Sequence, residues 1–85
     1  LTPAMVDGIA RRFAALAEPA RIRLLAELRH APANVTTLAR RTGLAQPSVT
    51  KHLGVLRDVG LVDSERQGTQ NVYRVCDASV FSLCQ

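Results

Sequence analysis

Apolar residues near the start of the chain recur at the spacing of an α-helix. One stripe is formed by Met5, Ile9, Phe13 and Leu16, which lie four, four and three positions apart. Thr2 followed by Pro3 is a typical helix start, because threonine caps the first backbone N–H groups and proline is tolerated in the first turn. We therefore expect a first helix over this stripe.

A second helix is expected to begin at Pro19. Its apolar face is formed by Ile22, Leu25 and Leu28, and Leu24 widens that face. Residues 31–34 (Ala-Pro-Ala-Asn) interrupt the pattern, so this helix should end near Arg29.

A short third helix is predicted over residues 37–42. Thr36 can cap it, after Val35, which is a candidate for a very short strand. Gly43 fits the left-handed backbone position just past the end of this helix.

A fourth helix follows after a turn over residues 44–46. Pro47 opens it, it runs to about Val59, and Gly60 ends it in the same way as Gly43 ends its neighbour. Two helices joined by such a turn predict a helix-turn-helix over residues 36–59.

The rest of the chain indicates a β-hairpin. Residues 61–65 and 71–75 have extended patterns, and residues 67–70 form the loop between them. A last helix is expected from Asp77. A hairpin directly after a helix-turn-helix is typical of a winged helix. The predicted fold is α+β and mostly α, one domain over residues 1–85 with about five helices and a two-stranded wing.

Charge adds a candidate partner. The chain of 85 residues has a net charge of +4 and a pI near 10.0, and it contains no acidic residue between Glu27 and Asp58. Such a surface suits a nucleic acid, although a solvated basic face is the alternative reading.

Membrane and enzyme classes are not favoured. No apolar run approaches the roughly 20 residues that span a membrane. Asp7, Arg11 and Arg12 stand where a signal peptide would be apolar, so we expect a cytoplasmic protein. No nucleophile lies near a base, and no paired carboxylates or phosphate-binding glycine loop are seen, so we expect no enzyme.

The fourth helix has the pattern of a DNA recognition helix. At about 100° per residue, Val49, Leu53 and Leu56 share one side, and Lys51 lies opposite. Gly54 lies on the same outer side, where a residue without a side chain would allow close approach to a phosphate backbone; a neutral surface glycine is the alternative.

Polar residues on and beside this helix are the candidate DNA contacts. Gln46 can read adenine and Lys51 guanine, while Ser48 and Thr50 can reach phosphates or bases. Gln46 and Ser48 could instead only cap the helix, and His52 could instead be bonded within the fold. The predicted DNA-binding residues, including two helix-end arginines and the wing, are Arg40, Arg41, Gln46, Pro47, Ser48, Thr50, Lys51, His52, Arg57, Arg66, Gln67, Thr69 and Arg74.

These residues resemble the ArsR/SmtB family of bacterial repressors. The matching blocks are residues 13–25 (FAALAEPARIRLL), 38–39 (LA), 43–53 (GLAQPSVTKHL), 56–57 (LR), 60–62 (GLV), Arg66, Gly68 and 73–75 (YRV), within about residues 9–76. The resemblance implies a homodimer, joined through its first and last helices, that represses transcription at a palindromic operator in double-stranded DNA. It also implies release by an inducer, often a metal, a metalloid or thiol oxidation.

The usual metal ligands of that family are not matched. Residues 33–38 contain no cysteine or histidine, and Glu65 and Asp77 are isolated. Cys76 and Cys84 remain as candidate sensors that could bind a metalloid or metal as thiolates, or could be oxidised. In a continuous helix they lie about 12 Å apart, beyond the about 7 Å that a disulfide needs. An intrachain bond or a shared metal would therefore need a break in the last helix, and pairing across a dimer interface is the other possibility. Two buried, inert thiols are the alternative.

The functional expectation is a dimeric repressor released from DNA by an inducer. Two alternatives stay open at this point, a winged-helix module that binds proteins and a DNA-binding regulator that has no chemical sensor.

Overall fold

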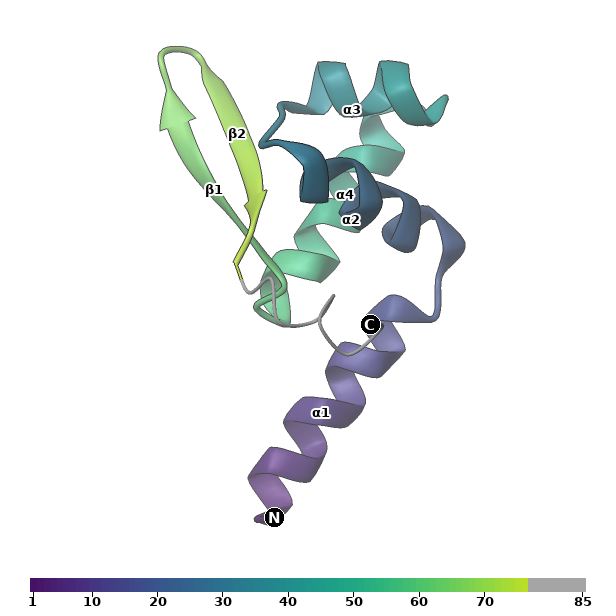
Figure 1. Ribbon diagram of the computed structural model, residues 1–85, viewed down its shortest axis with the longest axis vertical. Helices are drawn as coiled ribbons and strands as arrows, with labels where there is room; N and C mark the ends of the chain where they lie inside the picture. The colour runs from purple at the N-terminus through teal and green to yellow at the C-terminus, as the bar shows by residue number, and fades with distance from the viewer. Residues whose placement is uncertain (77–85) are drawn as a thin grey trace.

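The computed structural model describes residues 1–76 (Figure 1). The elements in order are α1 (Pro3–Leu16), α2 (Pro19–His30), α3 (Val35–Thr42), α4 (Gln46–Asp58), β1 (Val62–Gln67) and β2 (Gln70–Val75). This order confirms the predicted winged helix-turn-helix. The helix expected from Asp77, which would be the fifth, lies outside the described residues.

Helix α1 begins as predicted and leaves most of its surface open. The N–H of Met5 donates to Thr2 Oγ1 at 3.1 Å, which is the expected cap. Ala15 in the last turn is the buried residue of this helix. Figure 1 shows α1 extending away from the other elements, and among the described residues it is the C-terminal half of α1 that lies beside them.

Helix α2 is central to the core, but the predicted composition of its buried face was partly wrong. Leu24, Leu25 and Leu28 are buried, whereas Ile22 is 52% exposed. The three leucines share one side of the helix, and Ile22 lies about 110° away from their mean direction. The leucines face α4 and the wing, so Ile22 is left on the surface.

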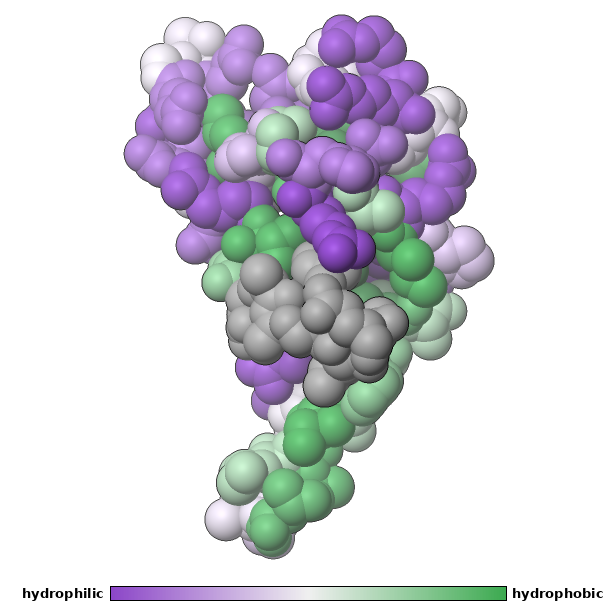
Figure 2. All heavy atoms as spheres, viewed as in Figure 1, coloured by the Kyte–Doolittle hydropathy of each residue, from purple (hydrophilic) through white to green (hydrophobic). Residues whose placement is uncertain are grey.

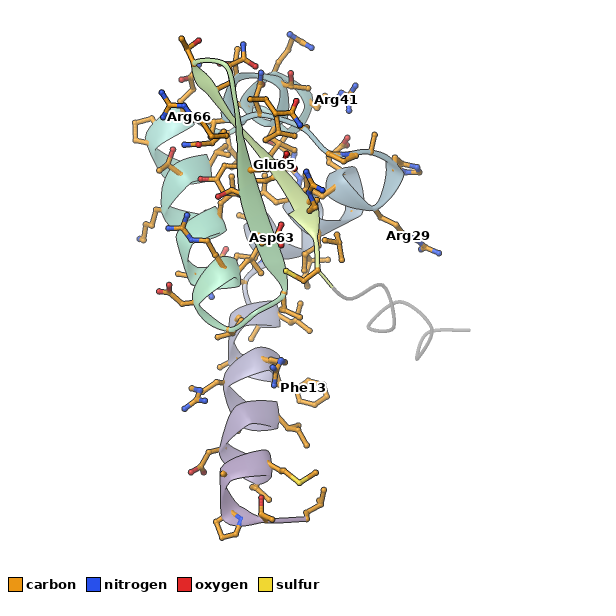
Figure 3. The ribbon with its side chains drawn as sticks, turned by 90° about the vertical axis from the view of Figure 1, so that its left-hand side faces the viewer. Phe13, Arg29, Arg41, Asp63, Glu65 and Arg66 are labelled. Atoms are coloured by element: carbon orange, nitrogen blue, oxygen red, sulfur yellow. The ribbon has the colours of Figure 1, made fainter. Side chains whose placement is uncertain are left out.

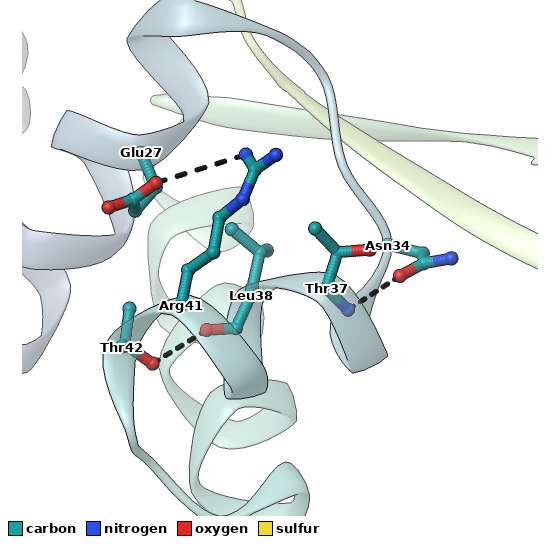
Figure 4. Close-up of polar contacts among 6 residues, drawn as sticks. All are labelled: Glu27, Asn34, Thr37, Leu38, Arg41 and Thr42. Atoms are coloured by element: carbon teal, nitrogen blue, oxygen red, sulfur yellow. Dashed lines mark hydrogen bonds and ion pairs between the residues drawn. The ribbon is translucent and has the colours of Figure 1, made fainter.

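The start of α3 also differs from the prediction. The chain is extended at Ala33, where Ala33 and Tyr73 exchange N–H···O=C bonds of 3.1 and 2.9 Å with each other. Asn34 then caps the helix, because its Oδ1 accepts from the N–H of Thr37 at 2.8 Å (Figure 4). Val35 is therefore helical rather than a strand, and Thr36 is not the cap.

The turn between α3 and α4 follows the predicted geometry. Gly43 has a φ of 76°, the left-handed conformation that favours glycine. Thr42 is buried, and its hydroxyl donates to the carbonyl of Leu38 at 2.7 Å (Figure 4). Helix α4 begins at Gln46, one residue before Pro47, and ends at Asp58.

The wing is a two-stranded antiparallel hairpin with longer strands than predicted. Its register runs from Val62 opposite Val75 to Gln67 opposite Gln70. The turn needs only Gly68, with a φ of 63°, and Thr69, so pairing continues to the end of each strand. Val62 and Tyr73 point to the core, as the alternation of a strand requires.

The core joins the inner sides of all the elements. Its buried apolar residues are Ala15, Leu24, Leu25, Leu28, Ala33, Leu38, Val49, Leu53, Leu56, Leu61, Val62 and Tyr73.

In residues 1–76 no helix is long and apolar enough to cross a membrane.

Candidate functional site

The rotation of α4 about its own axis is set by its buried side. Val49, Leu53 and Leu56 have no exposed surface. Burying a side chain of this size contributes about 1.5–3 kcal/mol, so the helix cannot turn without losing several kcal/mol. The opposite side, with Thr50 and Lys51, is consequently held in solvent, as predicted from the spacing.

The first turn of α4 has no side-chain cap. Ala45 is the N-cap residue and offers no side-chain acceptor. Gln46 is exposed and Ser48 is half-buried, and neither caps the helix. The reading in which they serve only as caps is therefore wrong. Because no side chain caps them, the first N–H groups of this turn suit phosphate or base oxygens.

Gly54 has no intramolecular reason to be glycine among the described residues. A Cβ built at this position meets no atom within 4 Å, and the backbone is helical. Space for a side chain is thus present in the folded chain.

His52 is bonded within the fold. Its Nδ1 accepts from Arg21 Nε at 3.2 Å, and the ring is half-buried. The alternative of a histidine bonded inside the protein is what the structure shows, and a DNA contact by His52 stays a prediction.

The two arginines at the end of α3 differ in their partners. Arg41 Nη1 lies 3.9 Å from Glu27 Oε2 (Figure 4), and its side chain is still 47% exposed. A pair this open contributes little and leaves the guanidinium available to a stronger anion. Arg40 is exposed beside it.

The tip of the wing presents one ordered arginine. Arg66 Nε donates to the carbonyl of Gly68 at 3.0 Å, which holds the guanidinium next to the turn (Figure 3). Gln67 and Thr69 are exposed at the same tip.

Arg74 is engaged inside the wing instead. Its Nη2 donates to Glu65 Oε2 at 2.5 Å, and its Nε lies 3.7 Å from Asp63 Oδ1. These are cross-strand neighbours, because Asp63 pairs with Arg74 in the register. The predicted DNA role of Arg74 therefore has a competing structural explanation that the sequence pattern did not reveal.

A further contact joins the wing to the helix-turn-helix. Asn34 Nδ2 donates to Gln70 Oε1 at 2.7 Å, while the other end of the Asn34 amide caps α3. Sequence reasoning missed this bond, because its partners are 36 positions apart.

Arg57 lies away from the start of α4. It borders a hollow of about 250 Å³ together with Arg11 and Arg12 of α1. Eleven residues of helix separate it from Gln46, or about 16 Å. The structure therefore places Arg57 beside Arg11 and Arg12 of α1 rather than with Gln46 and Lys51.

Of the two candidate sensor residues, Cys76 is among the described residues. Cys76 is exposed directly after β2, and its N–H donates to the carbonyl of Leu61 at 3.0 Å. Cys84 lies outside the described residues, and so does any pairing between the two. Within residues 1–76, no three His, Cys, Asp or Glu side chains come together as a metal site.

Comparison with known proteins identifies the architecture. Residues 16–65 match the family described as helix-turn-helix domain. The transcriptional regulator NmtR of Mycobacterium tuberculosis is 41% identical over 75 residues, which are 88% of this chain and 62% of NmtR. This chain thus spans about three fifths of that relative's length.

Two further comparisons cover more of the related protein. The biofilm growth-associated repressor of Xylella fastidiosa is 32% identical over 91% of this chain and 68% of its own length. The solution structure of a homodimeric winged helix-turn-helix DNA-binding domain from Mycobacterium bovis, described as a possible ArsR-family regulator, has a TM-score of 0.90 and 33% identity. It covers 96% of this chain and 79% of that domain. The chain therefore belongs to the ArsR/SmtB-type family of winged helix-turn-helix regulators.

Proposed function

We propose that the chain binds double-stranded DNA sequence-specifically and regulates transcription as a homodimeric repressor. The observation that carries this proposal is the two-sided character of α4. One side is fully buried, the outer side exposes Thr50 and Lys51, and Gln46 is exposed at the first position of the helix. The 18 residues that precede Gln46 contain no carboxylate.

The dimensions of DNA suit this helix. The major groove is about 12 Å wide and admits one α-helix. Gln46 would pair with adenine, Lys51 would reach guanine acceptors, and Thr50 would donate to a phosphate. Arg66 at the wing tip would meet the backbone or the minor groove beside the same half-site.

Charge pairing supports the same surface. Glu27 lies near Arg41, and Asp63 and Glu65 share Arg74, so the charge of these three carboxylates is partly compensated. Lys51 and Arg66 are not in those ion pairs. A net positive potential near them would attract DNA over the Debye screening length, which is roughly 10 Å at 0.1 M salt.

The outer side of α1 supports a homodimer. Met5, Val6, Ile9 and Phe13 are between 42% and 65% exposed. Figure 2 shows hydrophobic surface gathered along α1, and Figure 3 shows Phe13 projecting outward from it. Soluble monomers rarely leave a continuous apolar stripe of this kind open, so a second copy is the proposed cover. A last helix, which the sequence predicts from Asp77 and which lies outside the described residues, would complete this interface.

Repression is carried over from the relatives, and release by an inducer is carried over from the family resemblance. Those named above are transcriptional regulators and a repressor. The proposed inducer is a metalloid, a metal or an oxidant acting at Cys76 and Cys84, and the proposed target is a palindromic operator reached in the cytoplasm.

Selection of duplexes from a random-sequence library tests the function. The expected product is a palindrome whose half-sites lie one helical turn apart, bound with an affinity that falls steeply as salt rises. Lys51→Ala is the matched variant, since it removes one outward charge and no buried contact. If the selection recovers no common sequence, and the chain instead binds a protein with an affinity that does not change with salt, the domain is a protein-interaction winged helix.

A further inference from the structure

Arg21, near the start of α2, contacts both neighbouring helices with one guanidinium. Its Nε donates to His52 Nδ1 of α4 at 3.2 Å, and its Nη1 donates to the carbonyl of Ala15 in α1 at 3.3 Å. Arg21 and His52 are half-buried and Ala15 is buried. Because the guanidinium is planar and rigid, the two bonds together fix the end of α1 relative to the middle of α4.

The packing of α1 makes this connection important. Ala15 is the buried residue of α1, and most of the helix is exposed. The direction of α1 relative to α4 therefore depends on a few contacts, those of its last turn and those of Arg11 and Arg12 beside Arg57. The Arg21 bonds lie at that last turn.

We propose that Arg21 is a positioning residue that holds α4 at a fixed angle to α1 and so determines which half-site spacing the dimer accepts. The inference rests on the proposed function, since it takes α1 as the dimer helix and α4 as the recognition helix. It assigns to Arg21 and His52 a role in operator geometry, separate from direct contact with DNA.

Small changes of angle suffice for such a role. Six residues separate His52 from Gln46, which is about 9 Å along the helix. A tilt of about 10° around His52 moves the start of α4 by about 1.6 Å. In a symmetric dimer both helices move, and the sum is close to the rise of one base pair, about 3.4 Å.

The bond between Arg21 and His52 also determines the tautomer of the histidine ring. A guanidinium has donors and no acceptor, so Nδ1 of His52 must be the unprotonated nitrogen. The neutral ring consequently carries its hydrogen on Nε2. This tautomer follows from the Arg21 bond alone and is observable without DNA.

The test measures affinity for operators whose half-sites are moved one base pair closer together or farther apart. Arg21→Lys keeps the charge but offers one ammonium in place of the fork, and His52→Leu removes the acceptor. We expect both variants to lower the preference for the selected spacing at least about threefold, a change of about 0.7 kcal/mol. His52→Asn restores an acceptor near the position of Nδ1 and should keep the wild-type preference.

Arg23→Lys is the matched control on the same helix. Arg23 donates to the carbonyl of Thr42 at the end of α3, so it does not connect α1 with α4. The spacing preference should stay within twofold of wild type, and thermal unfolding checks that each variant is folded. Equal loss of preference in Arg23→Lys would overturn the specific role of Arg21.

Two readouts separate this inference from the proposed function. A wild-type chain that binds no duplex overturns the proposed function and the inference with it. Wild-type binding with a spacing preference that Arg21→Lys retains overturns the inference alone. In ¹⁵N NMR spectra of the full chain without DNA, we expect the Nε2–H tautomer of His52, and an Nδ1–H tautomer would also overturn it.

Discussion

Replacing Gly54 with alanine should raise stability and lower DNA affinity at the same time. Gly54 lies inside the 13-residue helix α4, where glycine is less favourable than alanine by about 1 kcal/mol. The added Cβ has no atom within 4 Å in the folded chain, so no clash offsets this gain. The melting temperature should therefore rise by about 4–8 °C, the usual effect of 1 kcal/mol in a small domain.

The effect on binding has the opposite sign. If the backbone at Gly54 lies against a DNA phosphate or sugar, the methyl group of alanine would collide with it. Overpacking of an interface that fits closely costs about 1–3 kcal/mol, which corresponds to a loss of affinity between about fivefold and 150-fold.

Fluorescence anisotropy with the selected operator at one salt concentration measures the loss, and calorimetry measures stability. Gly8→Ala is the matched control, because Gly8 is also inside a helix and its Cβ would be 3.4 Å from the flexible end of Arg12. We expect it to raise stability without changing DNA affinity. A Gly54→Ala chain that is more stable and binds DNA as tightly as wild type would refute the close approach and leave Gly54 as a neutral surface glycine.

Three further predictions concern the other proposed surfaces. Lys51→Ala should weaken operator binding about tenfold and leave dimerisation intact in sedimentation experiments; unchanged affinity would remove Lys51 from the interface. Phe13→Ser should shift the chain toward monomer at micromolar concentration, because it replaces a 65% exposed aromatic side chain on the proposed dimer stripe, and an unchanged sedimentation coefficient would place the interface elsewhere. Cys76→Ser combined with Cys84→Ser should abolish induction by arsenite or oxidants in a reporter strain while leaving uninduced repression unchanged; wild-type induction in this variant would argue against a thiol sensor.

Local patterns were sufficient to predict helix α4 and the wing. The period of Val49, Leu53 and Leu56 determines which side of α4 is buried, because side chains at helical spacing share a face in any environment. Glycine at positions 43 and 68 marks turns for an equally local reason, since both backbones are left-handed. The fold class and the outward placement of Lys51 could therefore be predicted without knowledge of distant contacts.

Contacts between distant segments decided the remaining features. Ile22 continues an apolar helical pattern, yet it is exposed because α4 and the wing cover the other side of α2. Asn34 caps α3 because the preceding residue, Ala33, is held in an extended bridge by Tyr73. Neither outcome is contained in the neighbouring residues.

The charged side chains show the same division most clearly. Arg74 reads as a basic wing residue, but the register of the hairpin sets it between Asp63 and Glu65. Arg21 and His52 are 31 positions apart and meet only because α2 packs against α4. Helical and strand periods specify the direction of a side chain from its own element, whereas the partner that it meets depends on which other element the folded chain brings there.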